Sequence, residues 1–177
     1  MDKQVLLDKS IRRVPDFPKP GILFYDISGI LMVPEAFSYC IEKMCELVKK
    51  SGANTLAGIE TRGLIFSAVI AERLGMPLML VRKKGKLPGK TYSCSYALEY
   101  GTAEIEIHVA DVKPGQKVLL VDDLIATGGT LKAARSLMEM GGAQVTGYLG
   151  AVGLPFLKYD EALAPLPVMT VINYDAE

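Results

Sequence analysis

Two adjacent acids followed by a loop of small residues carry the most informative chemistry in the sequence. Asp122 and Asp123 come directly after an apolar run. A loop of small and hydroxyl-bearing residues then leads into a helical pattern: Ala126, Thr127, Gly128, Gly129 and Thr130. Unpaired N–H groups at a helix N-terminus bind phosphate, and glycines let it approach the main chain. Since carboxylates accept hydrogen bonds from hydroxyls, this order predicts a site for a ribose 5-phosphate. A helix cap beside two acids is the alternative.

A second turn could bind a more anionic group. Glu60, Thr61, Arg62 and Gly63 follow the short apolar run Thr55–Ile59. Turn N–H groups and a guanidinium together suit a pyrophosphate. A plain strand-to-helix turn would have a similar sequence.

A basic segment rich in glycine and proline lies further along the chain. Its cations are Arg82, Lys83, Lys84, Lys86 and Lys90. Such a segment can fold over a pyrophosphate and exclude water, and the alternative is a solvated, charged loop. Within it, Gly85–Thr91 imitates a P-loop but has one residue too few between its glycines. A P-loop nucleotidase is therefore a distant alternative.

An apolar segment near the start could hold a flat base. Ile22, Leu23 and Phe24 lie between glycine, proline and polar residues. Apolar side chains can stack on a base while neighbouring backbone groups bind its edge. A segment that only packs on the core is the alternative.

The elements that must position these residues alternate between helix and strand. Apolar spacing predicts helices over Pro34–Lys50, Leu64–Leu74 and Thr130–Met140. Strands are predicted at Thr55–Ile59, Leu78–Val81, Glu104–Val109, Val118–Val121, Val145–Val152 and Val168–Ile172. This order predicts an α/β fold with a mostly parallel sheet flanked by helices, and ligands beyond the carboxyl ends of the strands. With 177 residues and no linker-like stretch, we expect a single domain, 1–177.

One predicted strand alternates strictly between charged or polar and apolar residues. Glu104, Glu106 and His108 alternate with Ile105 and Ile107. Period two indicates a half-exposed strand, so the two glutamates and the histidine are expected on its solvated face.

Composition excludes several classes of function. Twenty Lys plus Arg against twenty Asp plus Glu give a net charge of zero, so the basic excess typical of nucleic-acid binding is missing. A single histidine argues against His-rich zinc sites and Ser–His–Asp triads. The three cysteines lack a Cys-x-x-Cys arrangement and are expected to be free thiols. The N-terminal residues have no sustained apolar stretch, which predicts a cytoplasmic, non-membrane protein.

The residues match a known family. Val118–Thr130 resembles the phosphoribosyl-diphosphate (PRPP) binding signature of type I phosphoribosyltransferases. Phe17–Ser28 and Arg82–Tyr100 resemble the members of that family that act on adenine. With Glu60–Gly63 between them, the resemblance runs from about Val14 to the end of the chain.

The resemblance implies a type I phosphoribosyltransferase-like fold with an N-terminal base-binding hood, 1–33, and a mobile lid loop, 82–98. It implies the conversion of adenine and PRPP to AMP and pyrophosphate, a purine-salvage reaction, through an oxocarbenium-like displacement at ribose C1. Mg²⁺ is the implied cofactor, without a dedicated protein metal site, and a homodimer is the implied assembly.

Roles for individual residues also come from the resemblance. The 5′-phosphate and ribose are assigned to Asp122, Asp123, Ala126, Thr127, Gly128, Gly129 and Thr130. The pyrophosphate is assigned to Glu60, Thr61, Arg62, Arg82, Lys83 and Lys86, and adenine to Leu23, Phe24, Tyr25 and Leu124. The catalytic candidates are Glu99, for proton exchange with adenine, and Arg62, and Tyr100 belongs to the lid.

Two further functions stay open from the sequence. Tyr25 stands where the family usually has a basic residue, so a different base is the nearest rival to adenine. A regulator that binds PRPP without turnover would use the same cradle, although the sequence adds no basic segment for DNA.

Overall fold

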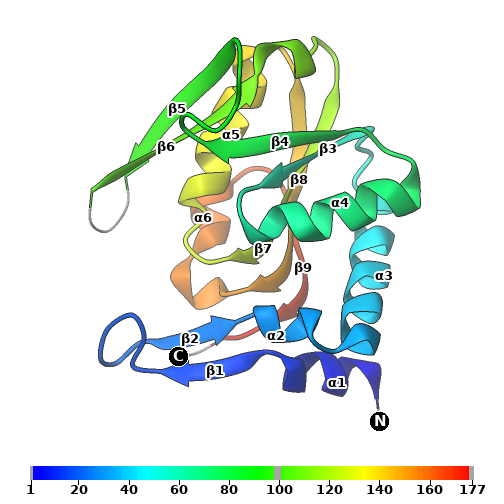
Figure 1. Cartoon of the computed structure of the whole chain (residues 1–177), viewed down its shortest axis with the longest axis vertical. Helices are drawn as coiled ribbons and strands as arrows, with labels where there is room; N and C mark the ends of the chain where they lie inside the picture. The colour runs from blue at the N-terminus through cyan, green and yellow to red at the C-terminus, as the bar shows by residue number, and fades with distance from the viewer. Residues whose placement is uncertain (1, 98–100, 176–177) are drawn as a thin grey trace.

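The chain forms one seven-stranded sheet with helices on both faces and a small two-stranded sheet at one end (Figure 1). The computed structural model describes residues 2–97 and 101–175. Its helices are α1 (Lys3–Ser10), α2 (Ser28–Leu31), α3 (Pro34–Lys50), α4 (Arg62–Leu74), α5 (Gly129–Met140) and α6 (Tyr159–Leu163). Its strands are β1 (Arg12–Pro15), β2 (Leu23–Asp26), β3 (Thr55–Ile59), β4 (Leu78–Lys83), β5 (Thr91–Ala97), β6 (Thr102–His108), β7 (Lys117–Ile125), β8 (Gln144–Gly153) and β9 (Val168–Asn173).

The large sheet is mostly parallel, as the alternation of elements predicted. Its strand order is β5-β6-β4-β3-β7-β8-β9. The strands β4, β3, β7, β8 and β9 run parallel to one another, whereas β5 and β6 form an antiparallel hairpin at the β4 edge. The carboxyl ends of β4, β3 and β7 therefore lie next to one another, which is where α/β sheets bind ligands.

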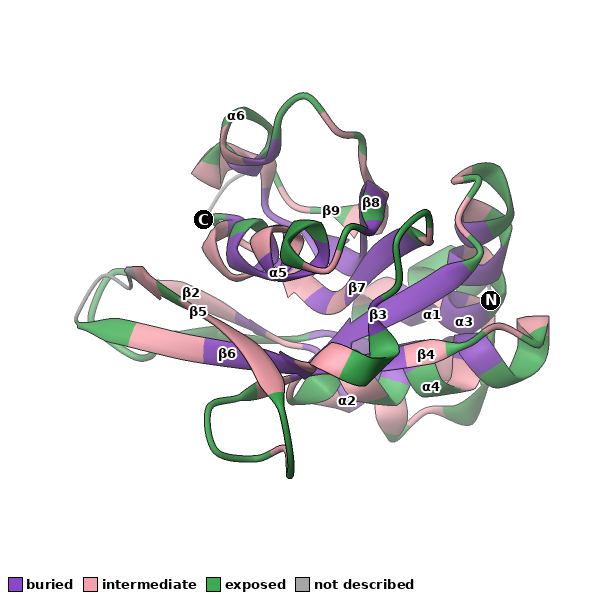
Figure 2. Ribbon diagram, turned by 90° about the horizontal axis from the view of Figure 1, so that it is seen from above, coloured by how far each residue is buried: buried purple, intermediate pink, exposed green. Residues whose placement is uncertain are grey.

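The central strands are buried on both faces because apolar residues follow one another along them. On β7, Leu119 and Val121 pack with α3 and α4, while Val118 and Leu120 pack with α5. Figure 2 shows the central strands buried and the β5–β6 hairpin projecting from the body with partly exposed residues. This two-sided core fixes the strand ends that carry the candidate site.

The main helices agree with their sequence signals. Proline is the first residue of α3, a position where its missing N–H costs nothing. The helix α4 ends at Gly75, whose φ of 62° is the left-handed cap conformation that glycine favours. Among the described residues, the structure contains no helix long and apolar enough to cross a membrane.

The structure corrects the sequence prediction at three places. The strand β7 runs through both acids to Ile125, so Asp122 and Asp123 lie inside the strand rather than after it. The lid segment 82–98 is a loop only between β4 and β5, since Thr91–Ala97 forms a paired strand. Elements α1, β1, β2, α2, β5 and α6 were not predicted.

Candidate active site

A cavity of about 320 Å³ opens at the carboxyl ends of β3, β4 and β7. It is lined by the turn after β3, the last residue of β4, the acid pair of β7 and the start of α5. Asp122, Leu124 and Thr130 also line a smaller cavity of about 100 Å³ around the loop 126–129. The two cavities thus share a wall, and both are built from segments that the sequence singled out.

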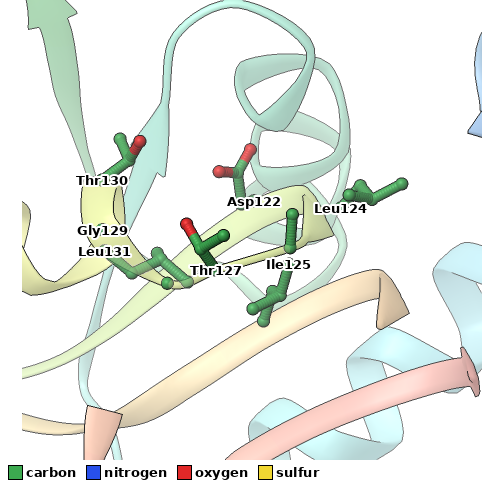
Figure 3. Close-up of a pocket in the computed structure, with 9 residues that line it drawn as sticks. Asp122, Leu124, Ile125, Thr127, Gly129, Thr130 and Leu131 are labelled. Carbon is green, nitrogen blue, oxygen red and sulfur yellow. The ribbon is translucent and has the colours of Figure 1, made fainter. Parts of the chain in front are cut away.

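The loop between β7 and α5 has the form of a phosphate cradle. Figure 3 shows the Asp122 carboxylate and the Thr127 hydroxyl pointing into the same space. Gly128 precedes the helix with φ of 83°, and a Cβ there would lie 2.9 Å from Leu163. A Cβ on Gly129 would meet nothing closer than 3.9 Å, so internal packing does not require glycine there. The open space beside Gly129 belongs to the cavity, where an anion could reach the N-terminus of α5.

The two acids occupy different environments. Asp123 is 6% exposed, and its Oδ2 accepts a hydrogen bond of 2.7 Å from Arg62 Nε. Asp122 is partly exposed toward the cavity, and its Oδ1 accepts from the backbone N–H of Asp123 at 2.8 Å. Loss of solvation and the adjacent negative charge of Asp123 raise the pKa of Asp122 well above its ordinary value, against the lowering effect of Arg62. The pair therefore offers one ion-paired and one poorly compensated carboxylate.

Close packing of α4 against β7 brings Arg62 to the acids. A Cβ on Gly63 would lie 3.0 Å from the Asp122 Cα and 3.1 Å from the Val121 carbonyl oxygen. Only glycine lets the first turn of the helix approach the strand this closely. Gly63 was predicted as part of a turn, and the structure gives it this specific role.

On the opposite side of the cavity, Glu60 binds the end of β4. The backbone N–H of Lys83 donates to Glu60 Oε2 at 2.8 Å, and Arg82 Nε donates to the same oxygen at 3.3 Å. The Lys83 hydrogen bond is the main reason that the pKa of Glu60 lies below its ordinary value, and Arg82 adds to it. The peptide bond between Glu60 and Thr61 is cis. Glu60, Thr61, Arg62 and Lys83 all line the cavity.

The basic residues do not all reach that cavity. Lys86 lies on the exposed loop after β4, where its carbonyl accepts a 3.1 Å hydrogen bond from Arg82 Nη1. The P-loop alternative fails here, because Gly85–Thr91 leads into β5 and not into a helix.

The residues assigned to adenine separate into two groups. Leu23 and Phe24 are half-buried on β2, and Phe17 meets the Phe24 ring edge-on at 5.1 Å. Tyr25 is only 5% exposed, and its ring stacks on Tyr174 with centroids 4.3 Å apart. The Tyr25 ring thus anchors the hood to the chain after β9. Leu23, Phe24 and Tyr25 line neither cavity, whereas Leu124 lines both. Glu99 and Tyr100 lie outside the described residues.

One residue of this site was missed by the sequence analysis. Tyr96 on β5 lines the larger cavity, and its hydroxyl accepts a 3.2 Å hydrogen bond from Thr130 Oγ1. It therefore links the β5–β6 hairpin to the start of α5. Its place inside the matched stretch Arg82–Tyr100 was the available signal, but a tyrosine between serine and alanine has no distinctive spacing.

The fold and the residues that line the cavities identify the protein family. The sequence pattern of the phosphoribosyl transferase domain family matches residues 31–151. This range contains the turn after β3, the basic loop, the acid pair and the phosphate cradle. The chain therefore belongs to the phosphoribosyltransferase family.

Individual relatives narrow the class. An adenine phosphoribosyltransferase of Treponema denticola is 62% identical over 175 residues, which is 99% of this chain and 92% of the relative. The crystal structure of the adenine phosphoribosyltransferase of Thermoanaerobacter pseudethanolicus superimposes with a TM-score of 0.92 at 40% identity, covering 97% of this chain and 99% of that one. The Saccharomyces cerevisiae enzyme, complexed with an imino-altritol bisphosphate and adenine, gives 0.88 at 35% identity, covering 96% and 98%. Within its family, the chain belongs to the adenine phosphoribosyltransferases.

Proposed function

We propose that this protein transfers the 5-phosphoribosyl group of PRPP to adenine, which yields AMP and pyrophosphate. The observation that carries this proposal is the meeting of an acid pair, a glycine-rich helix start and Arg62 around two cavities that share a wall. Its relatives are adenine phosphoribosyltransferases over nearly the whole chain. The reaction is a step of purine salvage.

The cradle suits the 5′-phosphate and ribose of PRPP. We assign the phosphate to the loop of Ala126, Thr127, Gly128, Gly129 and Thr130, where the N-terminus of α5 supplies backbone donors. Asp122 and Asp123 are assigned to the ribose 2′ and 3′ hydroxyls. Hydroxyl groups donate hydrogen bonds, and ionised carboxylates are strong acceptors.

The opposite wall suits the pyrophosphate. Arg62 has five N–H donors, so it can keep its Nε bond to Asp123 and still donate to an anion. Lys83 and the turn residues Glu60 and Thr61 line the same space. Arg82 donates a hydrogen bond to the backbone carbonyl of Lys86, and the two side chains extend the positive charge along the loop. These groups stabilise the charge that accumulates on departing pyrophosphate, while bond breaking leaves oxocarbenium character at ribose C1.

Mg²⁺ fits this chemistry as an ion held mainly by substrate oxygens. Among residues 2–97 and 101–175, no three His, Cys, Asp or Glu side chains gather where they could hold a metal. We assign the protein contacts of the ion, direct or through water, to the carboxylates of Asp122 and Asp123, which are hard oxygen ligands that line the large cavity. Bound there, Mg²⁺ would neutralise charge on the pyrophosphate.

Adenine is assigned to the space between the hood and Leu124. The half-buried side chains of Leu23 and Phe24 offer apolar surface on one side, and Leu124 lines both cavities on the other. Because the Tyr25 ring is stacked on Tyr174, only the backbone of that residue is proposed to contact the base. We assign proton exchange with adenine to Glu99 from the family resemblance alone, and the lid role of Tyr100 likewise.

The oligomeric state and the cellular compartment belong to the same proposal. We infer a homodimer from the resemblance to the family, and a cytoplasmic enzyme because the three cysteines are free thiols.

The test is product analysis with PRPP and Mg²⁺ and, in separate reactions, adenine, guanine, hypoxanthine, xanthine and uracil. AMP from adenine alone is the expected result. A nucleotide from a different base would overturn the assignment of the base site but keep the reaction. Tight binding of PRPP without any product would indicate a regulator instead.

A further inference from the structure

Glu106 is a buried carboxylate that the proposed mechanism does not use. It lies on β6 between Ile105 and Ile107, and only 2% of the residue is exposed. Its alternation with isoleucines predicted a solvated side chain, and the structure shows that prediction to be wrong. A buried charge is stable only when its oxygens are hydrogen-bonded.

Within the described part of the chain, the Glu106 carboxylate accepts hydrogen bonds from three donors, which lie in the loop between β4 and β5 or at the start of β5. Oε1 accepts from the backbone N–H groups of Lys86 and Leu87, both at 2.9 Å. Oε2 accepts from Thr91 Oγ1 at 3.3 Å. Burial raises the pKa of Glu106, but the bonds from Leu87, Lys86 and Thr91 outweigh it, and the pKa lies below its ordinary value. The group is therefore ionised at neutral pH.

The Lys86 residue connects Glu106 to the candidate active site. Its N–H binds Glu106, and its carbonyl accepts from Arg82 Nη1 at 3.1 Å. Arg82 in turn donates to Glu60, which lines the large cavity. A continuous series of contacts thus runs from the buried carboxylate through the basic turn to the wall assigned to pyrophosphate.

We propose that Glu106 is a positioning residue that holds the Lys86–Leu87 turn so that the cations of the basic loop face the pyrophosphate. This proposal rests on the proposed function of the site. Glu106 acts through the loop backbone, so its loss is expected to weaken use of PRPP and to leave the adenine side unaffected.

The chain offers a matched control on the same strand. Glu104 also binds this loop, through a 3.1 Å ion pair with Lys84, but its side chain is 37% exposed. Exposed ion pairs contribute little, since water screens them. The variant Glu104→Ala therefore removes the same charge from the same strand without removing the buried anchor.

The experiment compares Glu106→Ala, Glu106→Gln and Glu104→Ala by steady-state kinetics and limited trypsin digestion. For Glu106→Ala we expect the KM for PRPP to rise about tenfold or more, because charge-assisted hydrogen bonds to two backbone donors are lost. The KM for adenine should stay within about twofold, as expected for a loss of binding confined to one substrate. Glutamine can still accept from both N–H groups, so Glu106→Gln should restore the KM for PRPP to within about threefold.

Trypsin digestion reports on the loop without any turnover. Cleavage after Lys84 and Lys86 should be faster in Glu106→Ala than in Glu104→Ala. Equal PRPP KM values and equal cleavage rates in these two variants would overturn the proposal, as would a parallel rise of both substrate KM values. If Glu106→Ala does not fold, Thr91→Val is the second variant. It removes one hydrogen-bond donor to the Glu106 carboxylate and should raise the KM for PRPP by about threefold.

The outcome is separable from that of the proposed function. If the wild-type protein makes no AMP, the proposed function fails. The role of Glu106 is then decided by calorimetric binding of pyrophosphate with Mg²⁺, where Glu106→Ala is again expected to bind about tenfold more weakly than Glu104→Ala. Equal affinities would overturn it.

Discussion

Asp122, which we assign to the ribose of PRPP, carries a charge that the folded protein compensates poorly. It is next to a second carboxylate, and Arg62 binds that neighbour and not Asp122 itself. Desolvation and the charge of Asp123 therefore raise its pKa, which means that the folded protein resists its ionisation. Such poorly compensated groups concentrate at functional sites.

The sign of this effect can be tested with Asp122→Asn. Because the folded pKa is raised, the folded state binds more protons than the unfolded state between the ordinary and the raised pKa, and stability falls as pH rises through that window. Above the raised pKa the penalty is complete. We expect Asp122→Asn to raise the Tm by a few degrees at about pH 8, with the gain shrinking as pH falls and disappearing at about pH 3, where the carboxylate is protonated in both states. Its kcat/KM for PRPP should fall at least about tenfold.

The measurement is a series of thermal melts of both proteins across pH, with Asp111→Asn as a control at an exposed acid. A variant that melts below wild type at every pH would contradict the assignment of an uncompensated charge to Asp122.

At the scale of elements, the junction between β7 and α5 positions the acid pair beside the helix N-terminus. The strand carries the acids, and the helix begins at Gly129 immediately after the left-handed Gly128. The two glycines are adjacent in sequence, but the structure requires them for different reasons. Gly128 has a positive φ, and a side chain there would clash with Leu163. A side chain on Gly129 would meet no protein atom closely and would instead project into the cavity.

Matched alanine substitutions separate these two requirements. Gly128→Ala should destabilise the protein by roughly 1–3 kcal/mol, because it strains the backbone and clashes with Leu163. Gly129→Ala should leave the Tm unchanged, yet its methyl group would enter the space assigned to the 5′-phosphate and raise the KM for PRPP about tenfold or more. Thermal melts and PRPP kinetics check both. Normal PRPP kinetics in Gly129→Ala would contradict the assignment of the 5′-phosphate to this loop.

The elements also show what could be predicted from sequence. Helix α3 and the central strands were found because their apolar residues are regularly spaced and bury large faces. The hood was missed as structure because β1 is exposed along its whole length and so has no hydrophobic pattern. Its stack of Tyr25 on Tyr174 joins residues at opposite ends of the chain, which no local pattern encodes.

Glu106 marks the limit of period-two reasoning. The alternation with isoleucine is real, and Ile105 and Ile107 are buried as expected. The other face is solvated only if nothing covers it, and here the loop after β4 supplies N–H donors to that face. That the acid pair and the loop 126–130 would lie together was predictable because each residue type was informative locally, whereas the contacts of Glu106 and Tyr96 are tertiary.

At the scale of the whole molecule, one sheet separates two apolar layers. The layer of α3 and α4 is continuous with the hood, and the layer of α5, which begins at the loop 126–129, lies on the other face of the sheet (Figure 1). Both layers share the strands β3, β7 and β8, so loss of these strands disrupts both. Such an arrangement favours cooperative unfolding.

The cysteines provide a direct test of that cooperativity. Cys40 is fully buried on α3, and burial raises its pKa to about 12, whereas Cys94 on β5 is partly exposed. In the folded protein at about pH 8, a thiol reagent should therefore modify Cys94 and leave Cys40 unmodified, because the thiolate is the reactive form. With rising denaturant, modification of Cys40 should follow the same midpoint as the loss of circular dichroism. Mass spectrometry of tryptic peptides locates the label. Reaction of Cys40 at denaturant concentrations where the sheet is intact would show that α3 opens separately, and the two layers would then be independent folding units.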